Sequence, residues 1–250
     1  MRGVVVDAGP EHSHAGMKSS LAIVIPVLDE AATLALRLRA LATLRRRGAQ
    51  VVVVDGGSTD DTLAIAQAHA DLALVAPRGR GSQMNAGAAA CAADILLFLH
   101  ADTVLSAQAD TLVQAALQDA AAWGRFDVRI DHPRTVFRCI ERLMNWRSRW
   151  SGIATGDQAV FVQREAFERV GGFADIPLME DIALSRALKR IAPPVCLRVC
   201  VTTSARRWEQ HGVWRTVWLM WLMWRLRAAY FFGADPRSLA VKYGYRPRPS

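Results

Sequence analysis

Acidic side chains follow three apolar runs of this sequence at the points where the runs end. They are Asp29 and Glu30 after LAIVIPV, Asp55 after VVVV and Asp102 after DILLFLHA. Short apolar runs of this kind are typical of strands buried on both faces of a parallel sheet. Because ligands bind beyond the carboxyl ends of such strands, we expect these carboxylates to surround one shared ligand site.

Asp102 is the predicted metal ligand of that site. A hard divalent cation such as Mg²⁺ or Mn²⁺ takes one or two carboxylates together with substrate phosphate oxygens, and it neutralises charge on a departing diphosphate. His100 lies two positions earlier and is expected on the same side of its strand. Its side chain either assists the metal or is a hydrogen-bonded histidine of the core.

The segment PRGRGSQMNAG (77–87) places Arg78 and Arg80 among glycines ahead of a predicted helix. Guanidinium groups and the N–H groups at a helix start bind phosphate. The phosphate loop with its GK[ST] sequence and the GxGxxG fingerprint are both missing from the sequence. Ordinary ATP-hydrolysing and dinucleotide-binding folds are therefore disfavoured.

The second half of the chain holds a further pair of acids, Glu180 and Asp181, at a predicted helix start. Acids in a first helical turn often only stabilise the helix dipole. A group-transfer enzyme, however, needs a base beside the acceptor hydroxyl. Gly156 and Asp157, in ATGDQAVF, are predicted to form a wall of the acceptor pocket.

These side chains require a scaffold in which strands and helices alternate. Apolar runs predict strands at 21–30, 51–54, 72–77 and 94–102, with helices at 31–47, 60–70, 82–93 and 108–122. The alternation predicts an α/β fold with a parallel sheet. Beyond it we expect a strand in GRFDVRI, a helix over 136–150 with arginine on its wet face, a strand and short helix in 156–173, and a helix in LMEDIALSRALKRI.

Composition sets further bounds. The 250 residues are 52% apolar, which excludes disorder of the whole chain, and a net charge of +8 suits anionic partners. The cysteines lack zinc-type spacing, so we expect reduced core residues of a cytoplasmic protein. Residues 1–20 lack the apolar segment of a signal peptide and are predicted to form a flexible tail.

Six motifs, taken in order, resemble inverting family 2 glycosyltransferases of the GT-A fold. They are IPVLDE, VVVVDGGSTDDT, RGRGSQMNAG, LHADT, GDQAVFVQREAFERVGGF and MEDIALSRAL, and they span roughly 21–192. The sequence is most similar to the small bacterial radical-SAM/selenodomain-associated subgroup. The resemblance implies a Rossmann-like, mostly parallel sheet flanked by helices in a domain at 21–212. Its nucleotide-sugar half would be 21–122 and its acceptor half 123–212.

The resemblance also implies roles for single residues. The donor would be bound by Pro26, Asp29, Glu30, Asp55, Arg80, Asn85, Ala101 and Arg207. Asp181 matches the general base of the family's E-D motif, and Glu180 is its neighbour. Asp102 matches the last acid of the D-x-D metal motif, whose first acid is replaced here by His100. Trp208 would join the acceptor pocket and His211 the metal.

The implied reaction moves one sugar from a nucleoside-diphosphate sugar, with UDP favoured, to an acceptor hydroxyl with inversion and with help from Mg²⁺ or Mn²⁺. Nucleic acid is not an expected partner. Two alternatives remain open: a nucleotidyltransferase, and a nucleotide-sugar binding protein that has lost its metal pair at His100. Their products differ, because a glycosyltransferase releases UDP or GDP and a nucleotidyltransferase releases pyrophosphate.

The end of the chain, 213–250, is predicted to hold an amphipathic, tryptophan-rich helix over 213–233. Its apolar centre, 216–224, is less than half of the roughly 20 residues needed to span a bilayer. Two accounts stay open. The helix lies on the inner face of the cell membrane, where it would bring a lipid-linked acceptor to the site, or it packs on the catalytic core or across a homodimer.

Overall fold

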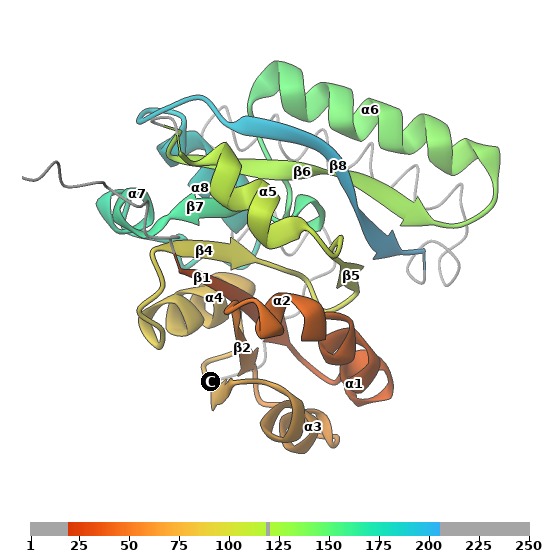
Figure 1. The fold of residues 1–250 in the computed structure, drawn as a ribbon, viewed down its shortest axis with the longest axis vertical. Helices are drawn as coiled ribbons and strands as arrows, with labels where there is room; N and C mark the ends of the chain where they lie inside the picture. The colour runs from red at the N-terminus through yellow and green to blue at the C-terminus, as the bar shows by residue number, and fades with distance from the viewer. Residues whose placement is uncertain (1–19, 119–120, 206–250) are drawn as a thin grey trace, which may run out of the picture.

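The structure is a computed structural model of the protein, and it describes residues 20–118 and 121–205. The described part is built on an eight-stranded sheet in the order β3-β2-β1-β4-β7-β6-β8-β5 (Figure 1). The strands are β1 (Leu21–Val27), β2 (Gln50–Asp55), β3 (Leu72–Val75), β4 (Ile95–Phe98), β5 (Thr103–Val104), β6 (Trp123–Asp131), β7 (Phe161–Gln163) and β8 (Val195–Ser204).

Helices connect these strands and cover the sheet. They are α1 (Ala31–Ala40), α2 (Ala42–Arg46), α3 (Thr62–His69), α4 (Arg80–Ala89), α5 (Ala109–Ala116), α6 (Thr135–Ser151), α7 (Arg164–Arg169) and α8 (Glu180–Leu188), with a 3₁₀ turn, η1 (Gly156–Gln158). No described helix is both long enough and apolar enough to cross a bilayer.

The sheet is mixed and mostly parallel, as the alternation of elements predicts. β3, β2, β1 and β4 are parallel to one another. The direction changes at β7, which pairs antiparallel with both β4 and β6. Since β2, β1 and β4 are adjacent, their carboxyl ends meet at one edge, and Val27 of β1 lies opposite Asp55 of β2.

Alternate residues of the central strands face two separate layers of the core. Ile23 and Val51 belong to the layer that contains Leu34 of α1, whereas Val24 faces the other layer with Met84 of α4. All five side chains are buried. This arrangement explains why the strands read as continuous apolar runs: helices cover both faces, so no position along the strand faces water.

Gly87 lets α4 lie close to the sheet. A Cβ atom at this position would come within 2.4 Å of Val24 Cγ1 and 2.9 Å of Val54 Cγ2. Such a close approach of helix and strand is possible only without a side chain. The position of α4, and with it the basic segment at its start, therefore depends on this glycine.

Helix α6 lies along β6, at the far end of the sheet from α3 (Figure 1). Phe137 and Ile140 of α6 pack on Ile130 of β6 in a small third cluster of the core. The helix ends at Gly152, which has the left-handed conformation with φ of 64° and donates its N–H to the carbonyl of Ser148. Glycine is the usual residue at such a helix end.

The strand predicted over 94–102 is shorter than expected. β4 ends at Phe98, and the residues that follow form a turn before β5. His100 and Asp102 are therefore not on one face of a strand, as the sequence pattern predicted. Helix boundaries also differ by a few residues, since α3 begins at Thr62 and α4 at Arg80.

The prediction that the cysteines are core residues is wrong. All four are free: Cys139 and Cys200 are exposed, and Cys91 and Cys196 are only partly buried. Cys196 and Cys200 do lie in a strand, β8. Beyond β8, however, the two-residue strand β5 pairs only with Thr202 and Thr203, so the rest of that side of β8 is an edge of the sheet.

Several predictions concern residues outside the described ranges. The N-terminal tail is one of them, apart from Ser20. The others are the helix at 213–233 and the site residues Arg207, Trp208 and His211. Their roles stay predictions.

Candidate functional site

A cleft of about 330 Å³ opens at the edge where the parallel strands end. Its walls come from the end of β1, the start of α4, the turn after β4 and the loop before α8. The lining residues are Pro26, Val27, Leu28, Glu30, Arg78, Gly79, Arg80, Gln83, His100, Ala101, Asp102, Pro177, Leu178 and Glu180. Six of them were predicted site residues: Pro26, Glu30, Arg80, Ala101, Asp102 and Glu180.

Asp29 and Asp55 lie outside this lining and brace the loops beside it. Asp55 is buried, with an exposed fraction of 2%, and its carboxylate accepts hydrogen bonds from the N–H and the hydroxyl of Ser58. The carboxylate of Asp29 accepts a bond from the N–H of Thr59 at 2.7 Å. The N–H of Asp29 in turn donates to Ser58 Oγ at 2.9 Å. The two acids thereby connect the loops that follow β1 and β2.

Asn85 also lies outside the lining, on the next turn of α4. Its side-chain amide donates to the carbonyl of Phe173 and accepts from the N–H of the same residue, both at 2.9 Å. This two-bond contact joins α4 to the segment between α7 and α8. In the structure, Asn85 therefore fixes the position of one wall relative to the other.

The basic wall of the cleft is the start of α4. Arg78, Gly79 and Arg80 lie together there, and α4 is ten residues long. A helix start carries a partial positive charge and N–H groups without partners inside the helix, so anions bind favourably at this end. Two guanidinium groups at the same end strengthen that preference.

Gln83 holds this wall in place, and the sequence analysis did not single it out. Its side-chain N–H groups donate to the carbonyls of Val27 at 2.9 Å and Val54 at 2.8 Å, so it ties α4 to β1 and β2. The residue is 4% exposed. Its place three residues after Arg80, on the same face of a helix, is the signal that could have identified it.

Pro177 and Leu178 complete the opposite wall and were also missed. They belong to the irregular loop that enters α8, just before Met179, which has a φ of 72°. No periodicity marks such a segment in a sequence. Contacts with the rest of the fold decide where it lies.

The predicted acceptor-side residues form a connected group next to the cleft. Asp181 Oδ2 accepts a hydrogen bond from the N–H of Gly156 at 3.0 Å, and its other oxygen accepts one from Ile182. His100, which lines the cleft, lies with Nδ1 3.6 Å from Asp157 Oδ1. The His100 ring also touches Gly156, where a Cβ atom would come within 2.3 Å of it. His100 thus connects the cleft to the residues around Asp181.

Glu180 is the acid of the pair that faces the cleft, and it is 7% exposed. Burial raises the pKa of its carboxyl above the usual value, and the adjacent Asp181 raises it further. Arg80 and His100 act in the opposite direction. Glu180 consequently keeps its proton to a higher pH than an exposed glutamate does.

The described residues fit a divalent cation that arrives with its substrate. Within 20–118 and 121–205, no three His, Cys, Asp or Glu side chains gather into a ready-made metal cage. Mg²⁺ in phosphate-transfer sites is commonly held by one or two carboxylates plus substrate phosphates. Asp102, in the cleft with Arg78 and Arg80, offers that kind of ligand.

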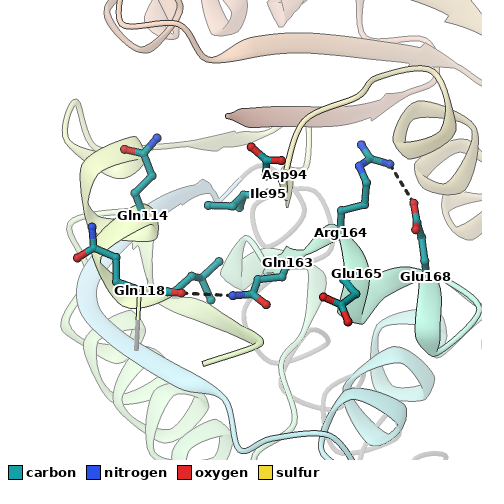
Figure 2. A pocket seen from close by; sticks show the side chains of 9 residues that line it. Asp94, Ile95, Gln114, Gln118, Gln163, Arg164, Glu165 and Glu168 are labelled. Atoms are coloured by element: carbon teal, nitrogen blue, oxygen red, sulfur yellow. Dashed lines mark hydrogen bonds and ion pairs between the residues drawn. The ribbon is translucent and has the colours of Figure 1, made fainter. Parts of the chain in front are cut away.

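A second cavity, of about 550 Å³, lies at the opposite end of β4 (Figure 2). Its lining residues come from the start of β4, the end of β7, and helices α5 and α7 with the residues just after α5. Gln163 donates to the carbonyl of Leu117 at 3.3 Å, and Arg164 pairs with Glu168 at 3.4 Å (Figure 2). Because ligands in α/β sheets bind at the carboxyl ends of the parallel strands, we place the functional site in the smaller cleft.

Comparison with known proteins identifies the family. Residues 22–174 match the family described as Glycosyl transferase family 2. A protein of Mycobacterium tuberculosis described as an uncharacterized glycosyltransferase is 32% identical over 134 residues, covering 52% of this chain and 60% of the relative. A protein of Mycobacterium bovis with the same description matches equally. This chain thus spans less than two thirds of the length of these relatives.

Solved structures show the same fold. The mannosyltransferase PcManGT of Pyrobaculum calidifontis, solved with GDP-Man and Mn²⁺, superposes with a TM-score of 0.60 at 19% identity, covering 92% of this chain and 70% of that one. Glucosyl-3-phosphoglycerate synthase of M. tuberculosis, solved with Mn²⁺, UDP and phosphoglyceric acid, gives 0.56 at 18% identity, covering 76% and 70%. The fold with its cleft, and a family match over more than half of the sequence, lead to one conclusion: this chain belongs to glycosyltransferase family 2 and has the GT-A fold.

Proposed function

We propose that the protein transfers one sugar from a nucleoside-diphosphate sugar to an acceptor hydroxyl, with inversion at the anomeric carbon and with UDP as the favoured nucleotide. The observation that carries the proposal is the cleft itself. It combines a basic helix start at Arg80 with the carboxylates of Asp102 and Glu180 at the carboxyl end of a parallel sheet. The neighbours solved with UDP or GDP-Man are consistent with such a donor.

The diphosphate of the donor would lie at the start of α4. There Arg78 and Arg80 neutralise its charge, and the dipole of α4 adds to the attraction. We assign the nucleoside to the loops after β1 and β2, near Pro26 and Glu30. Asp29 and Asp55 would act mainly by holding those loops in shape, since their carboxylates are bonded to Thr59 and Ser58.

Asp181 is the proposed general base. It would take the proton of the acceptor hydroxyl while that oxygen attacks the anomeric carbon and the nucleoside diphosphate leaves. Its orientation is held by the N–H groups of Gly156 and Ile182, and each carboxylate oxygen retains a second lone pair for the acceptor. Glu180, with its raised pKa, and Asp157 would shape the site around it.

Asp102 is the proposed metal ligand. Mg²⁺ or Mn²⁺, bound there together with the diphosphate, would supply charge neutralisation for the leaving group. His100 replaces a carboxylate in this position, so the protein would hold the cation with few ligands of its own. Affinity for free metal would then be low and would rise with the nucleotide bound.

The first experiment is thermal unfolding with UDP, GDP, ADP and CMP, each with and without Mn²⁺. At about 100 times the Kd, a ligand adds roughly 2.7 kcal/mol, enough to raise the midpoint by several degrees. A shift with one diphosphate that depends on Mn²⁺ is expected. The absence of any shift would favour a protein without a working donor site.

Turnover is then followed as nucleoside diphosphate released from UDP- and GDP-sugars, with pyrophosphate measured in parallel. Asp181→Asn should keep the nucleotide shift and lose at least about 100-fold in rate, the scale of one acid-base group. The exposed Asp175→Asn is the matched control. Equal rates for Asp181→Asn and the parent would remove Asp181 from the mechanism, and pyrophosphate release would identify a nucleotidyltransferase.

Asp102→Ala tests the metal assignment separately. We expect it to weaken the binding of UDP in the presence of Mn²⁺ and to leave metal-free binding nearly unchanged. An unaltered response to Mn²⁺ would place the cation elsewhere. Membership of the radical-SAM/selenodomain-associated subgroup, which rests on sequence resemblance alone, stays a proposal.

A further inference from the structure

Helix α6 has a second apolar face, directed away from the sheet. We call it the outer stripe, and its members are Val136, Cys139, Leu143, Trp146 and Trp150. Their spacing of three and four residues places them along one side of the helix. The face that packs on β6, with Phe137 and Ile140, lies on the opposite side. Packing of α6 within the domain therefore does not explain the outer stripe.

The outer stripe is open to solvent. Leu143 and Trp146 are each 64% exposed, and Trp150 is 81% exposed. The rings of Trp146 and Trp150 are stacked, with their centroids 6.3 Å apart and their planes within 4° of parallel. Single exposed apolar residues need no explanation, but a contiguous apolar strip on a regular element indicates a binding surface.

Charge around the stripe indicates what binds there. Helix α6 contains four arginines and one glutamate. Arg142 and Arg149 lie on one flank of the stripe; both are exposed, and Arg149 also pairs with Asp127 at 2.7 Å. A second copy of the same helix would bring like charges together, whereas an anionic surface would be attracted. Basic helices with tryptophan on an apolar face are typical of elements that lie in the headgroup region of a membrane.

We propose that the outer stripe of α6 binds an anionic lipid bilayer, with α6 parallel to the membrane plane. Trp146 and Trp150 enter the headgroup region, and Arg142 on the flank of the stripe contacts lipid phosphates. A helix of this length is about 26 Å long, so several headgroups fit along it. The residues of the stripe are distinct in sequence from the tryptophan-rich segment at 213–233.

The proposed surface is linked to the acceptor side of the cleft, and in this respect it rests on the proposed function. Helix α6 ends at Gly152, and the chain then leads directly to Gly156, whose N–H binds the Asp181 carboxylate. Ser148, in the last turn of α6, donates to the carbonyl of Ile153 at 2.9 Å and fixes this connection. A membrane on the outer stripe would thus be joined to the acceptor residues by a short, braced segment, which suits an acceptor carried by a lipid.

The test is sedimentation of the full chain with vesicles of phosphatidylcholine alone and of phosphatidylcholine mixed with phosphatidylglycerol. We expect binding to the mixed vesicles, weakened by salt, and a loss of at least about tenfold in affinity for Trp146→Ala/Trp150→Ala. The matched control is Leu36→Ala/Val75→Ala, which removes two exposed apolar side chains outside the stripe and should bind like the parent. Circular dichroism verifies that each variant is folded.

Three results would overturn the proposal. The first is that the parent protein does not bind the mixed vesicles. The second is that Trp146→Ala/Trp150→Ala binds them as the parent does, because binding would then belong to another part of the chain. The third is that light scattering shows the parent as a dimer and Trp146→Ala/Trp150→Ala as a monomer, which would make the stripe an interface between copies. The UDP-dependent shift in unfolding midpoint is measured on the same samples. Its absence in the parent would count against the donor site, whereas the vesicle results test only the stripe.

Discussion

Replacing Gln83 by leucine tests whether a single buried amide holds the basic wall of the cleft. Leucine is similar in size to glutamine but cannot donate a hydrogen bond. The substitution removes the bonds to the carbonyls of Val27 and Val54, at 2.9 and 2.8 Å. Because Gln83 is only 4% exposed, water cannot readily replace these donors.

The expected loss of stability follows from the bonds that remain. The carbonyl of Val27 also accepts the N–H of Gly56 at 3.0 Å, so it keeps one of its two partners. Each lost bond then costs about 1 kcal/mol, and the free energy of unfolding should fall by about 2 kcal/mol. In a chain of this size, that corresponds to about 4–8 °C in the unfolding midpoint.

Thermal unfolding of Gln83→Leu is compared with that of Gln163→Leu. Gln163 is half-buried, makes a single, longer side-chain bond to the carbonyl of Leu117 at 3.3 Å, and lies at the other end of the sheet. The control should lose less than about 1 kcal/mol and keep the full response to UDP. Gln83→Leu should show a reduced response as well, since the start of α4 is no longer tied to β1 and β2.

Equal midpoints for Gln83→Leu and the parent would refute the reasoning about stability. A lower midpoint with an unchanged response to UDP would refute the proposed link between Gln83 and phosphate binding at the basic wall. The two readings are independent, so either half of the argument can fail alone.

Two further predictions concern the acceptor side. Burial raises the pKa of Glu180, so above pH 4.5 the folded protein holds a proton that the unfolded chain releases. The free energy of unfolding should therefore fall as pH rises from 4.5 through the raised pKa, and Glu180→Gln should remove that fall. A difference in denaturant midpoint between variant and parent that does not change with pH would contradict this. Gly156→Ala places a Cβ atom within 2.3 Å of the His100 ring and should slow transfer by about tenfold to a hundredfold with UDP binding retained. In a His100→Ala background the same change should cost little, and an equal loss there would show that the ring is not the cause.

Much of the first half of the chain, 21–122, could be predicted from the sequence. The runs at β1 and β2 are buried on both faces, and the acids after them mark the edge where strands end. Which acid faces the cleft could not be predicted. Asp55 ends β2 and Glu30 follows β1, but Asp55 turns its carboxylate to Ser58, whereas Glu30 lines the cleft. That difference depends on loop contacts, which periodicity does not record.

The second half, 123–212, shows another limit of prediction from sequence. The helix over 136–150 was predicted correctly, with arginine on its wet face, but α6 carries apolar residues on two opposite sides. Spacing alone cannot tell the stripe that meets β6 from the stripe that meets solvent. Likewise, a strand was expected at β7, but side chains alternate in the same way in parallel and antiparallel strands, so its antiparallel direction could not be predicted.

The short pairing of β4 with β7 has a consequence for how this architecture can diversify. Only three residue pairs join the two strands at this seam: Ile95 with Gln163, Leu96 with Val162 and Leu97 with Phe161. On the β4 side of the seam, the strands β4, β1, β2 and β3 are all parallel to one another. A chimera that keeps the sheet through β4 and takes its acceptor half from another protein would have few side chains to match within the sheet at this seam. Such a narrow junction would let recombination exchange the proposed acceptor specificity while the proposed donor specificity is inherited intact.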